Sequence, residues 1–387
     1  MATLSSIISA DSHMLEPADL WTTRLEGKWR DNAPRVYWDD KQDALVFGCE
    51  GIPPARVAGL FAAGVADEDM PKALKAKLED ARPGGWDPAE RLKDMAVDSV
   101  EAEVLYTTLA FNLFWSTDGP FQEACFKVYN DWLAEFCSYD PTRFVGVGLI
   151  SLYDLDRGIA ELERCKKLGL GGAMIWASPP PEMAFIGTYH DKFWAAAQEM
   201  DIPISLHILT GHGEESKSLA GIGSPNRFLR TMALPNEIQR SLSQLIFGGT
   251  FDRFPRLKIV SAENEIGWVG YYLYRADRAW RRFRHVDAGA PAQTPSDYFR
   301  RNIWVTFIDD PIGLKLRHDI GVDRIMWSND YPHQASSWPH SMEVIERDFV
   351  GVSDEDKAKI CRDNAATLYG FDLKALAEKP LSAAAAD

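Results

Sequence analysis

The chain has no excess of basic residues and no long apolar run, and both absences narrow what it can do. Its 387 residues include 42 Lys and Arg against 57 Asp and Glu, a net charge of −15. Nucleic acids and anionic membrane surfaces bind clustered Lys and Arg, so neither is an expected partner. No apolar stretch approaches the roughly 18 residues of a transmembrane helix, and the N-terminus lacks the regions of a signal peptide.

Cysteine is also scarce, with five scattered residues and no Cys-x-x-Cys pair. An odd number without metal-binding spacing indicates reduced, mostly buried thiols rather than a disulfide framework. We therefore expect a cytoplasmic protein. With 46% hydrophobic and 26% charged residues, the composition is that of a globular chain with a large core.

Eight short apolar segments recur along the chain, and amphipathic segments of helix length separate most of them. The apolar segments are continuous rather than alternating, which is typical of parallel strands buried on both faces. Eight strand–helix repeats predict an α/β protein with a distorted (β/α)8 barrel, or TIM barrel. The expected strands are 5–11, 102–108, 144–150, 171–177, 203–208, 257–263, 302–307 and 324–330.

The residues in excess of a minimal barrel lie mainly between the first two strands. A hairpin is expected in 35–51, and a polar helix followed by a turn in 69–86. Loops after barrel strands lie at the catalytic mouth, so we expect an insertion over 18–95 that covers the mouth as a partial lid. The sequence therefore predicts a single metal-dependent TIM-barrel domain over 1–370, which includes this insertion, and a C-terminal tail over 371–387.

Polar residues stand at the predicted strand ends. Asp11 and His13 are two apart at the end of the first strand, so both side chains would point to the same side. His207 ends the fifth strand and Asp330 the eighth. Asp11 and His13 taken alone are more typical of a cap, a turn or a loop, whereas His207 and Asp330 lie at buried strand ends, where an imidazole or a carboxylate needs a partner. Together at the barrel mouth they predict a site for one divalent metal, with zinc expected and manganese or iron also suited.

Five segments carry a resemblance to a known family: ISADSHMLEPADLW, WDPAERLKDM, FWAAAQEMDIPISLHI, LIFGGTFDRFPRLKIVSAENEIGW and WSNDYPHQASSWPHS. They resemble the amidohydrolase-related family of the amidohydrolase superfamily, which includes aminocarboxymuconate-semialdehyde and γ-resorcylate decarboxylases. The resemblance spans about residues 5–370 and implies a mononuclear metal site on a distorted barrel. Carried over, the ligands are Asp11, His13, His207 and Asp330.

One departure from the family concerns catalysis. The decarboxylases have an acid/base histidine in the turn after the sixth strand, whereas this chain has SAENEIGW there. Glu263 or Asn264 takes that place. Glu263 would be a general acid or base if burial raises its pKa, or it would hold His207 through a hydrogen bond.

Other candidates at the mouth are individually weaker. His333, just past Asp330, would donate a proton or contact substrate, or is a buried turn histidine. His212 would contact substrate or belong to a loop, and Trp176 would form an aromatic wall or part of the core. Arg227 would clamp a substrate carboxylate, although surface arginines are commoner.

Two reactions suit one metal and one carboxylate base. The family resemblance favours non-oxidative decarboxylation of a small aromatic or unsaturated carboxylic acid. The alternative is hydrolysis of an amide, ester, lactone or C–C ketone bond by a metal-activated water, with Asp330 accepting its proton. A third hypothesis is a non-catalytic metal-binding barrel. A homodimer or homotetramer is expected, because such enzymes usually assemble.

Overall fold

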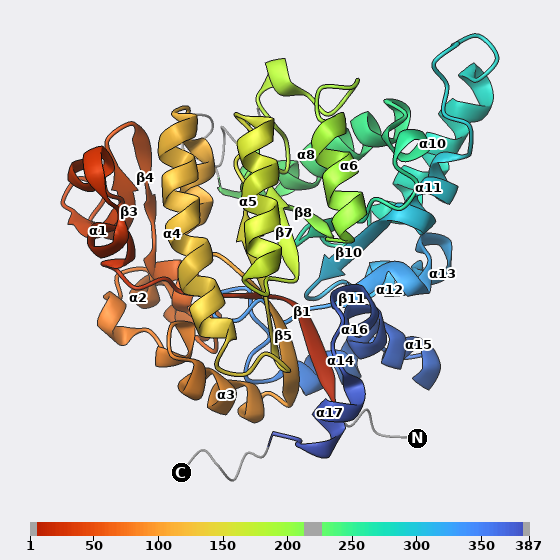
Figure 1. Ribbon diagram of the computed structural model, residues 1–387. Helices are drawn as coiled ribbons and strands as arrows, with labels where there is room; N and C mark the ends of the chain where they lie inside the picture. Colours follow the sequence, from red (N-terminus) through yellow and green to blue (C-terminus); the bar gives the residue numbers. More distant parts are fainter. Residues whose placement is uncertain (1–5, 213–226, 382–387) are drawn as a thin grey trace.

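The computed structural model describes residues 6–212 and 227–381, and it contains the predicted barrel (Figure 1). Its eight parallel strands follow one another around the sheet in chain order. The sheet closes where the Asp330 amide donates to the Asp11 carbonyl at 3.1 Å and the His13 amide to the Tyr331 carbonyl at 2.6 Å. The strands are β1 (Ile7–His13), β5 (Val100–Tyr106), β6 (Phe144–Leu149), β7 (Gly172–Ile175), β8 (Ile204–His207), β9 (Ile259–Ala262), β10 (Ile303–Phe307) and β11 (Ile325–Trp327). The predicted fold is therefore confirmed.

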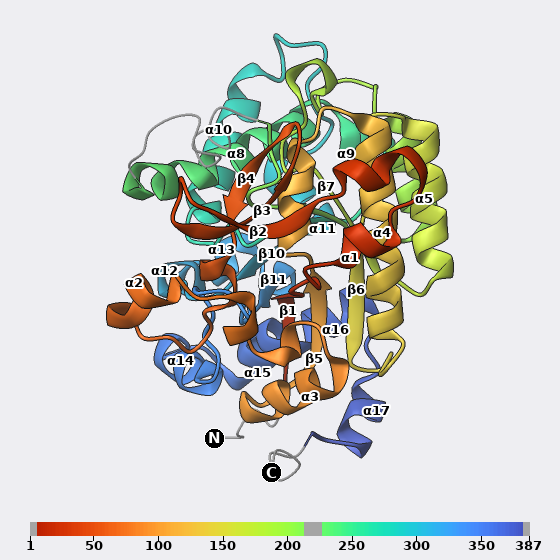
Figure 2. The same cartoon turned by 90° about the vertical axis from the view of Figure 1, so that its left-hand side faces the viewer.

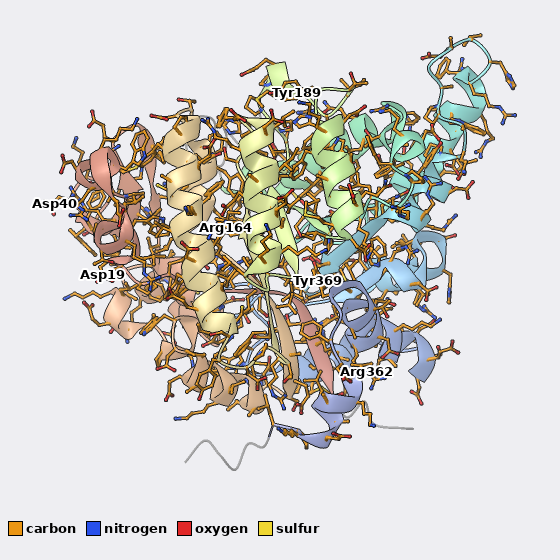
Figure 3. The ribbon with its side chains drawn as sticks, in the orientation of Figure 1. Asp19, Asp40, Arg164, Tyr189, Arg362 and Tyr369 are labelled. Atoms are coloured by element: carbon orange, nitrogen blue, oxygen red, sulfur yellow. The ribbon has the colours of Figure 1, made fainter. Side chains whose placement is uncertain are left out.

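Helices connect the strands and form the outer layer. The sequence marks their ends: Asp154 caps α5 by accepting from the Arg157 amide, and Gly169 follows its end with a φ of +90°. Arg164 on the outer face pairs with Glu161 and with Asp131 of α4 (Figure 3). The longer helices after β5 are α4 (Gly119–Cys137), α5 (Leu155–Lys167), α6 (Asp191–Met200), α8 (Arg227–Phe247), α10 (Val269–Phe283), α11 (Pro295–Asn302) and α14 (Ser341–Asp348).

Shorter helices complete the layer. They lie mostly after β10 and β11, where the chain packs around the closing side of the barrel (Figure 1). They are α9 (Thr250–Arg253), α12 (Pro311–Lys315), α13 (Arg317–Ile320), α15 (Asp354–Ala358), α16 (Asn364–Tyr369) and α17 (Leu373–Glu378). All five cysteines are free, and four of them are buried. Among the described residues, no helix has both the length and the apolar character of a membrane span.

The insertion between β1 and β5 contains a small antiparallel sheet, which lies in front of the barrel strands in Figure 2. The predicted hairpin is confirmed as β2 (Arg35–Asp39) and β3 (Ala44–Cys49), and β4 (Ile52–Arg56) adds a third strand. The two prolines of β4 are typical of a turn, so the sequence does not predict this strand; proline is tolerated there because β4 is an edge strand. The insertion also contains α1 (Leu20–Arg24) and α3 (Pro88–Val97).

The polar helix expected in 69–86 is wrong in extent. Only α2 (Met70–Ala73) is α-helical, and two 3-10 turns follow it. None of residues 71–80 is fully buried. A short helix in water is marginal without an apolar face to pack, so this segment forms separate turns instead.

Candidate metal centre and active site

Five ionisable side chains meet at the carboxyl ends of four barrel strands. Asp11 and His13 belong to the end of β1, and His207 is the last residue of β8. Glu263 directly follows β9, and Asp330 is the third residue after β11. We call these five residues the metal-centre cluster. Four have side chains that are at most 1% exposed, whereas the Glu263 side chain is 20% exposed.

The two imidazoles of the cluster face carboxylates from several strands. His13 Nε2 lies 3.4 Å from Asp11 Oδ1 and 3.2 Å from Asp330 Oδ1. It is also 3.7 Å from Glu263 Oε2. His207 Nε2 lies 3.4 Å from Asp11 Oδ1 and 3.4 Å from Glu263 Oε2. The two rings are perpendicular, with centroids 5.1 Å apart, so both nitrogens point toward the same small space.

The backbone fixes which nitrogen of each histidine faces this space. His13 Nδ1 lies 2.7 Å from the Thr107 carbonyl, and His207 Nδ1 lies 2.9 Å from the Ile208 carbonyl. A carbonyl only accepts, so both Nδ1 atoms donate, and a neutral ring then has its lone pair on Nε2. Histidines that bind metal ions are oriented in this way by a partner on the opposite nitrogen.

The cluster has the donor atoms that a cation needs. Within the described residues, Asp11 Oδ1, His13 Nε2, His207 Nε2 and both Asp330 carboxylate oxygens are buried without a hydrogen-bond partner. Buried polar atoms normally have partners, so five such atoms at one place suggest a ligand. Ligands about 2.1 Å from one ion lie about 3.0–3.4 Å apart. The separations of 3.2–3.7 Å are close to that spacing, and the residues present fit a divalent metal ion.

The electrostatics of the cluster also favour a positive charge. Burial alone would raise the pKa of Asp11, but the neighbouring His207 and His13 lower it well below the usual value. The pKa of Asp330 is lowered in the same way by His333 and His13 against the effect of burial. Burial would lower the pKa of His13, yet its carboxylate neighbours raise it well above the usual value. The carboxylates thus attract a proton or a metal cation to this point.

The backbone at two cluster residues is left-handed. Glu263 has a φ of +53° and Asp330 a φ of +54°. This conformation costs a non-glycine residue about 1–2 kcal/mol, and such strain concentrates at functional sites. Thr306 of β10 stabilises the arrangement: its Oγ1 accepts from the Glu263 amide at 2.8 Å and donates to Asp11 Oδ2 at 2.9 Å. Asn264 is turned to the backbone, with Nδ2 donating to the Ala262 carbonyl. Of the two residues, only Glu263 therefore faces the imidazoles of the metal-centre cluster.

His333 lies beside the metal-centre cluster. Its Nδ1 is 2.8 Å from Asp330 Oδ1, and its Nε2 is 3.0 Å from Thr108 Oγ1. Its ring stacks on His13 with centroids 4.0 Å apart. The structure therefore brings this predicted catalytic residue into direct contact with the predicted base.

A cavity of about 660 Å³ opens above the cluster. Glu263, Asp330 and His333 line one part of it, and the walls are mainly apolar. The insertion supplies much of the remaining lining, including residues of β3 and β4. The insertion residues of the lining are Gln42, Phe47, Pro53, Pro54, Ala55, Arg56, Val57, Gly59, Leu60 and Leu74.

Two of the predicted substrate-binding residues, His212 and Trp176, lie away from this lining. His212 Nε2 donates to the Phe114 carbonyl at 2.7 Å, and its ring lies near Trp115, which lines the cavity. Trp176 is 1% exposed and contacts His212 edge-on. Both remain predictions for substrate contact. Arg227 begins α8, and its side chain lies outside the described residues.

Three residues of the site are not predicted from the sequence. Arg56 and Thr108 line the cavity, and Thr306 joins Asp11 to Glu263. Thr306 is the fourth of five residues in β10, so a search for polar residues near every strand end would have found it. Arg56 lies at the end of a strand that its prolines conceal, and no signal in the sequence marks it.

The fold and the donor set define a (β/α)8-barrel protein with a site for a divalent metal ion. The chain belongs to the amidohydrolase family, whose profile matches residues 15–371, as the resemblance predicted. Among its relatives, the γ-resorcylate decarboxylase of Rhodococcus jostii (strain RHA1) is 31% identical over 259 residues. That region is 63% of this chain and 75% of the relative.

Solved structures share the fold. An amidohydrolase from Mycobacterium avium subsp. paratuberculosis K-10 has a TM-score of 0.77 at 24% identity, covering 95% of this chain and 100% of that one. A dihydroxybenzoic acid decarboxylase from Polaromonas sp. JS666 was solved with bound manganese and the inhibitor 2-nitroresorcinol. It has a TM-score of 0.64 at 22% identity, covering 95% of this chain and 97% of that one.

Proposed function

We propose that the protein is a metal-dependent lyase that decarboxylates a small aromatic or unsaturated carboxylic acid without oxidation. The observation that carries this proposal is the group of buried donor atoms that lack hydrogen-bond partners within the described residues. Asp11, His13, His207 and Asp330 would use them to hold one divalent ion beside the cavity. The decarboxylases among the relatives and solved structures support the same reaction.

We further propose manganese as the bound ion. Two aspartates provide hard oxygen ligands beside the two imidazoles, a mixture that suits manganese as well as zinc. Manganese is bound in the Polaromonas decarboxylase. Zinc remains the prediction from sequence, and so does a cytoplasmic homo-oligomer. When bound, the ion supplies positive charge that attracts the carboxylate and an adjacent oxygen of the substrate.

The cavity suits a flat, acidic substrate. Its volume of about 660 Å³ is within the usual range for small-molecule sites, and Phe47, Phe111 and Trp115 provide aromatic walls. Arg56 offers a guanidinium group to a substrate carboxylate. Because the insertion supplies this arginine and much of the lining, we propose that residues 18–95 act as the partial lid expected from sequence.

Asp330 is the residue that we assign to proton transfer. Its carboxylate, with Oδ1 2.8 Å from His333 Nδ1, receives a proton through His333 and gives it to the substrate carbon that bears the carboxylate. The bond to the carboxylate then breaks, its electron pair returns to the substrate ring, and CO2 leaves. His333 lines the cavity and can pass a proton from water back to Asp330. Glu263, also in the lining, remains a second candidate acid or base.

The same residues also suit the alternative reaction, and the family's description as an amidohydrolase favours keeping it. In hydrolysis, Asp330 would accept a proton from an attacking water rather than donate one to carbon. In decarboxylation the substrate carbon receives a proton, whereas in hydrolysis Asp330 receives one from water. Deuterated water therefore distinguishes the two reactions, because only decarboxylation places deuterium on carbon.

The test is incubation of the manganese-loaded protein with dihydroxybenzoates in deuterated water. We expect CO2 release, with one deuterium on the ring carbon that carried the carboxylate. Replacing Asp330 by Asn should lower kcat/KM by about 10²–10⁴-fold, the usual contribution of a positioned acid or base. Mass spectrometry of the product and the rate of CO2 release measure both effects. Inertness toward these acids, together with turnover of activated esters or lactones, would instead support hydrolysis.

A further inference from the structure

Glu263 differs from the other members of the metal-centre cluster in its surroundings. Its carboxylate lies 3.4 Å from His207 Nε2 and 3.7 Å from His13 Nε2, so it meets both imidazoles at once. It also lines the cavity, with a side chain 20% exposed, whereas His13 and His207 are fully buried. It is thus placed between the buried donor atoms and the space for substrate.

The contact with His207 excludes a purely supporting role for this carboxylate. A residue that orients a metal-binding histidine bonds the nitrogen opposite the metal. In His207 that nitrogen, Nδ1, already donates to the Ile208 carbonyl at 2.9 Å. Glu263 instead faces Nε2, the nitrogen that points into the cluster. Its position is therefore that of another ligand and not of a partner behind the histidine.

The spacing and the backbone agree with this position. Two ligands about 2.1 Å from one ion lie about 3.0–3.4 Å apart, and 3.4 Å separates Glu263 Oε2 from His207 Nε2. The left-handed backbone at Glu263, with φ at +53°, turns the side chain toward the cluster and is secured by Thr306. The same threonine hydroxyl donates to Asp11, so it fixes Glu263 and an aspartate of the cluster relative to each other.

We infer that Glu263 is a fifth protein ligand of the metal ion, on the side that faces the substrate. This inference rests on the proposed metal site but not on the proposed reaction. A fifth ligand makes three carboxylates and two imidazoles around one divalent ion, a net charge of −1. Such an oxygen-rich, anionic set favours a hard ion such as manganese over zinc. Being partly exposed, Glu263 is also the ligand best placed to give way to a chelating substrate.

Glu265 provides a matched control within the same loop. It is also a glutamate with a φ of +53°, and its Oε2 is buried without a partner in the described residues. Among the described residues no ion pair joins Glu265 to His13 or His207, whereas the Glu263 carboxylate lies within 3.7 Å of both imidazoles. Glu265→Gln therefore makes the same substitution in the same loop without changing a contact to these histidines.

The first measurement is the dissociation constant for Mn²⁺, by titration of the metal-stripped proteins with detection of free Mn²⁺ by electron paramagnetic resonance. Glu263→Gln should weaken binding at least tenfold, and Glu265→Gln less than threefold. A Glu263→Gln protein that binds Mn²⁺ as tightly as the wild type would overturn the inference. If that variant loosens Mn²⁺ but the wild type decarboxylates nothing, the inference stands and the proposed reaction fails.

A crystal structure of the wild-type protein loaded with Mn²⁺, without substrate, supplies a test that needs no variant to fold. A Glu263 carboxylate oxygen at about 2.0–2.6 Å from the ion, the range of metal–oxygen bonds, supports the inference. A separation above about 3 Å would contradict it, even if the charge of Glu263 affects the affinity. If Glu263 acted only as an acid or base, Glu263→Gln would lower kcat without changing the affinity for Mn²⁺, and the wild-type carboxylate would lie too far from the ion to bind it.

Discussion

Two buried polar clusters lie side by side at the first strand, and they differ in how their atoms are paired. The metal-centre cluster leaves five buried donor atoms without hydrogen-bond partners in the described residues. Its neighbour, which we call the support network, pairs nearly all of its polar atoms. The support network consists of Ser9, Ser12, Arg91, Asp98, Glu103, Asn329 and Ser341.

The support network joins segments that are far apart in the chain. Arg91 Nε donates to Glu103 Oε2 at 2.6 Å, and its Nη1 donates to the His13 carbonyl at 2.9 Å. Ser12 donates to Asn329 Oδ1 at 2.9 Å, and Asn329 donates to Asp98 Oδ2 at 3.1 Å. The remaining Arg91 nitrogen, Nη2, has no hydrogen-bond partner, but its guanidinium lies over the Tyr331 ring.

The two clusters differ in whether their buried polar atoms are hydrogen-bonded within the protein. Burying a polar group is costly unless it is hydrogen-bonded, and the support network meets that requirement within the protein. The metal-centre cluster does not meet this requirement, although four of its five side chains are buried to the same degree. A buried cluster whose polar atoms are hydrogen-bonded to one another stabilises the barrel. A buried cluster whose polar atoms lack such partners needs a bound ligand, here a metal ion.

The largest effect on stability should follow from breaking the support network. In Arg91→Met, the buried Glu103 carboxylate loses its partner, and removal of one member of a buried ion pair typically costs about 3–5 kcal/mol. The free energy of unfolding, from chemical denaturation of the metal-stripped protein, measures this loss. Replacing both residues by apolar ones should recover most of it. A loss below about 1 kcal/mol in the single variant would show that the two clusters do not differ as described.

His190 is a buried histidine that lies outside both clusters. His190 is buried among Phe185, Tyr189 and Trp194, and its Nε2 has no partner in the described residues. Burial lowers its pKa from 6.5 to about 4. Between those values the unfolded chain binds a proton that the folded protein excludes, so stability falls as the pH is lowered. The total loss is about 3 kcal/mol.

Denaturation curves between pH 7 and pH 4 measure this loss of stability. His190→Phe should remove the part of the pH dependence that comes from protonation of His190. The phenylalanine variant keeps the aromatic packing and cannot bind a proton, so it isolates the titration. Equal pH dependence in the two proteins would contradict the assignment. An isolated unpaired histidine thus stays neutral, whereas the histidines of the metal-centre cluster are surrounded by carboxylates.

The smallest effect should come from the residue that connects Asp11 to Glu263. Thr306→Val removes the hydroxyl that orients both, and loss of such a partner typically weakens metal binding about 10–100-fold. Thr250→Val is the control, because the buried Thr250 Oγ1 has no partner in the described residues. Mn²⁺ titration compares the two variants. Equal affinities would show that orientation by Thr306 contributes nothing.

The fold could be predicted because continuous apolar segments of strand length recur eight times, and each matches a barrel strand to within a few residues. Asp11 and His13 could be placed together because strand geometry puts residues two apart on one side. Glu263 could be placed at the end of the sixth strand. Its contact with both imidazoles could not be predicted, because it depends on a left-handed backbone that no residue type near it requires. Arg56 and Thr108 enter the site through tertiary packing of the insertion and the loop after β5, which sequence periodicity does not report.

The most direct test of the account is a Mn²⁺ titration of metal-stripped wild-type protein beside His207→Ala, followed by electron paramagnetic resonance. We expect one tightly bound ion per wild-type chain and a loss of tight binding in the variant, because one imidazole of the cluster is gone. Absence of a tight site in the wild type, or equal binding by both proteins, would contradict the claim that the unpaired atoms at the strand ends converge on a metal ion.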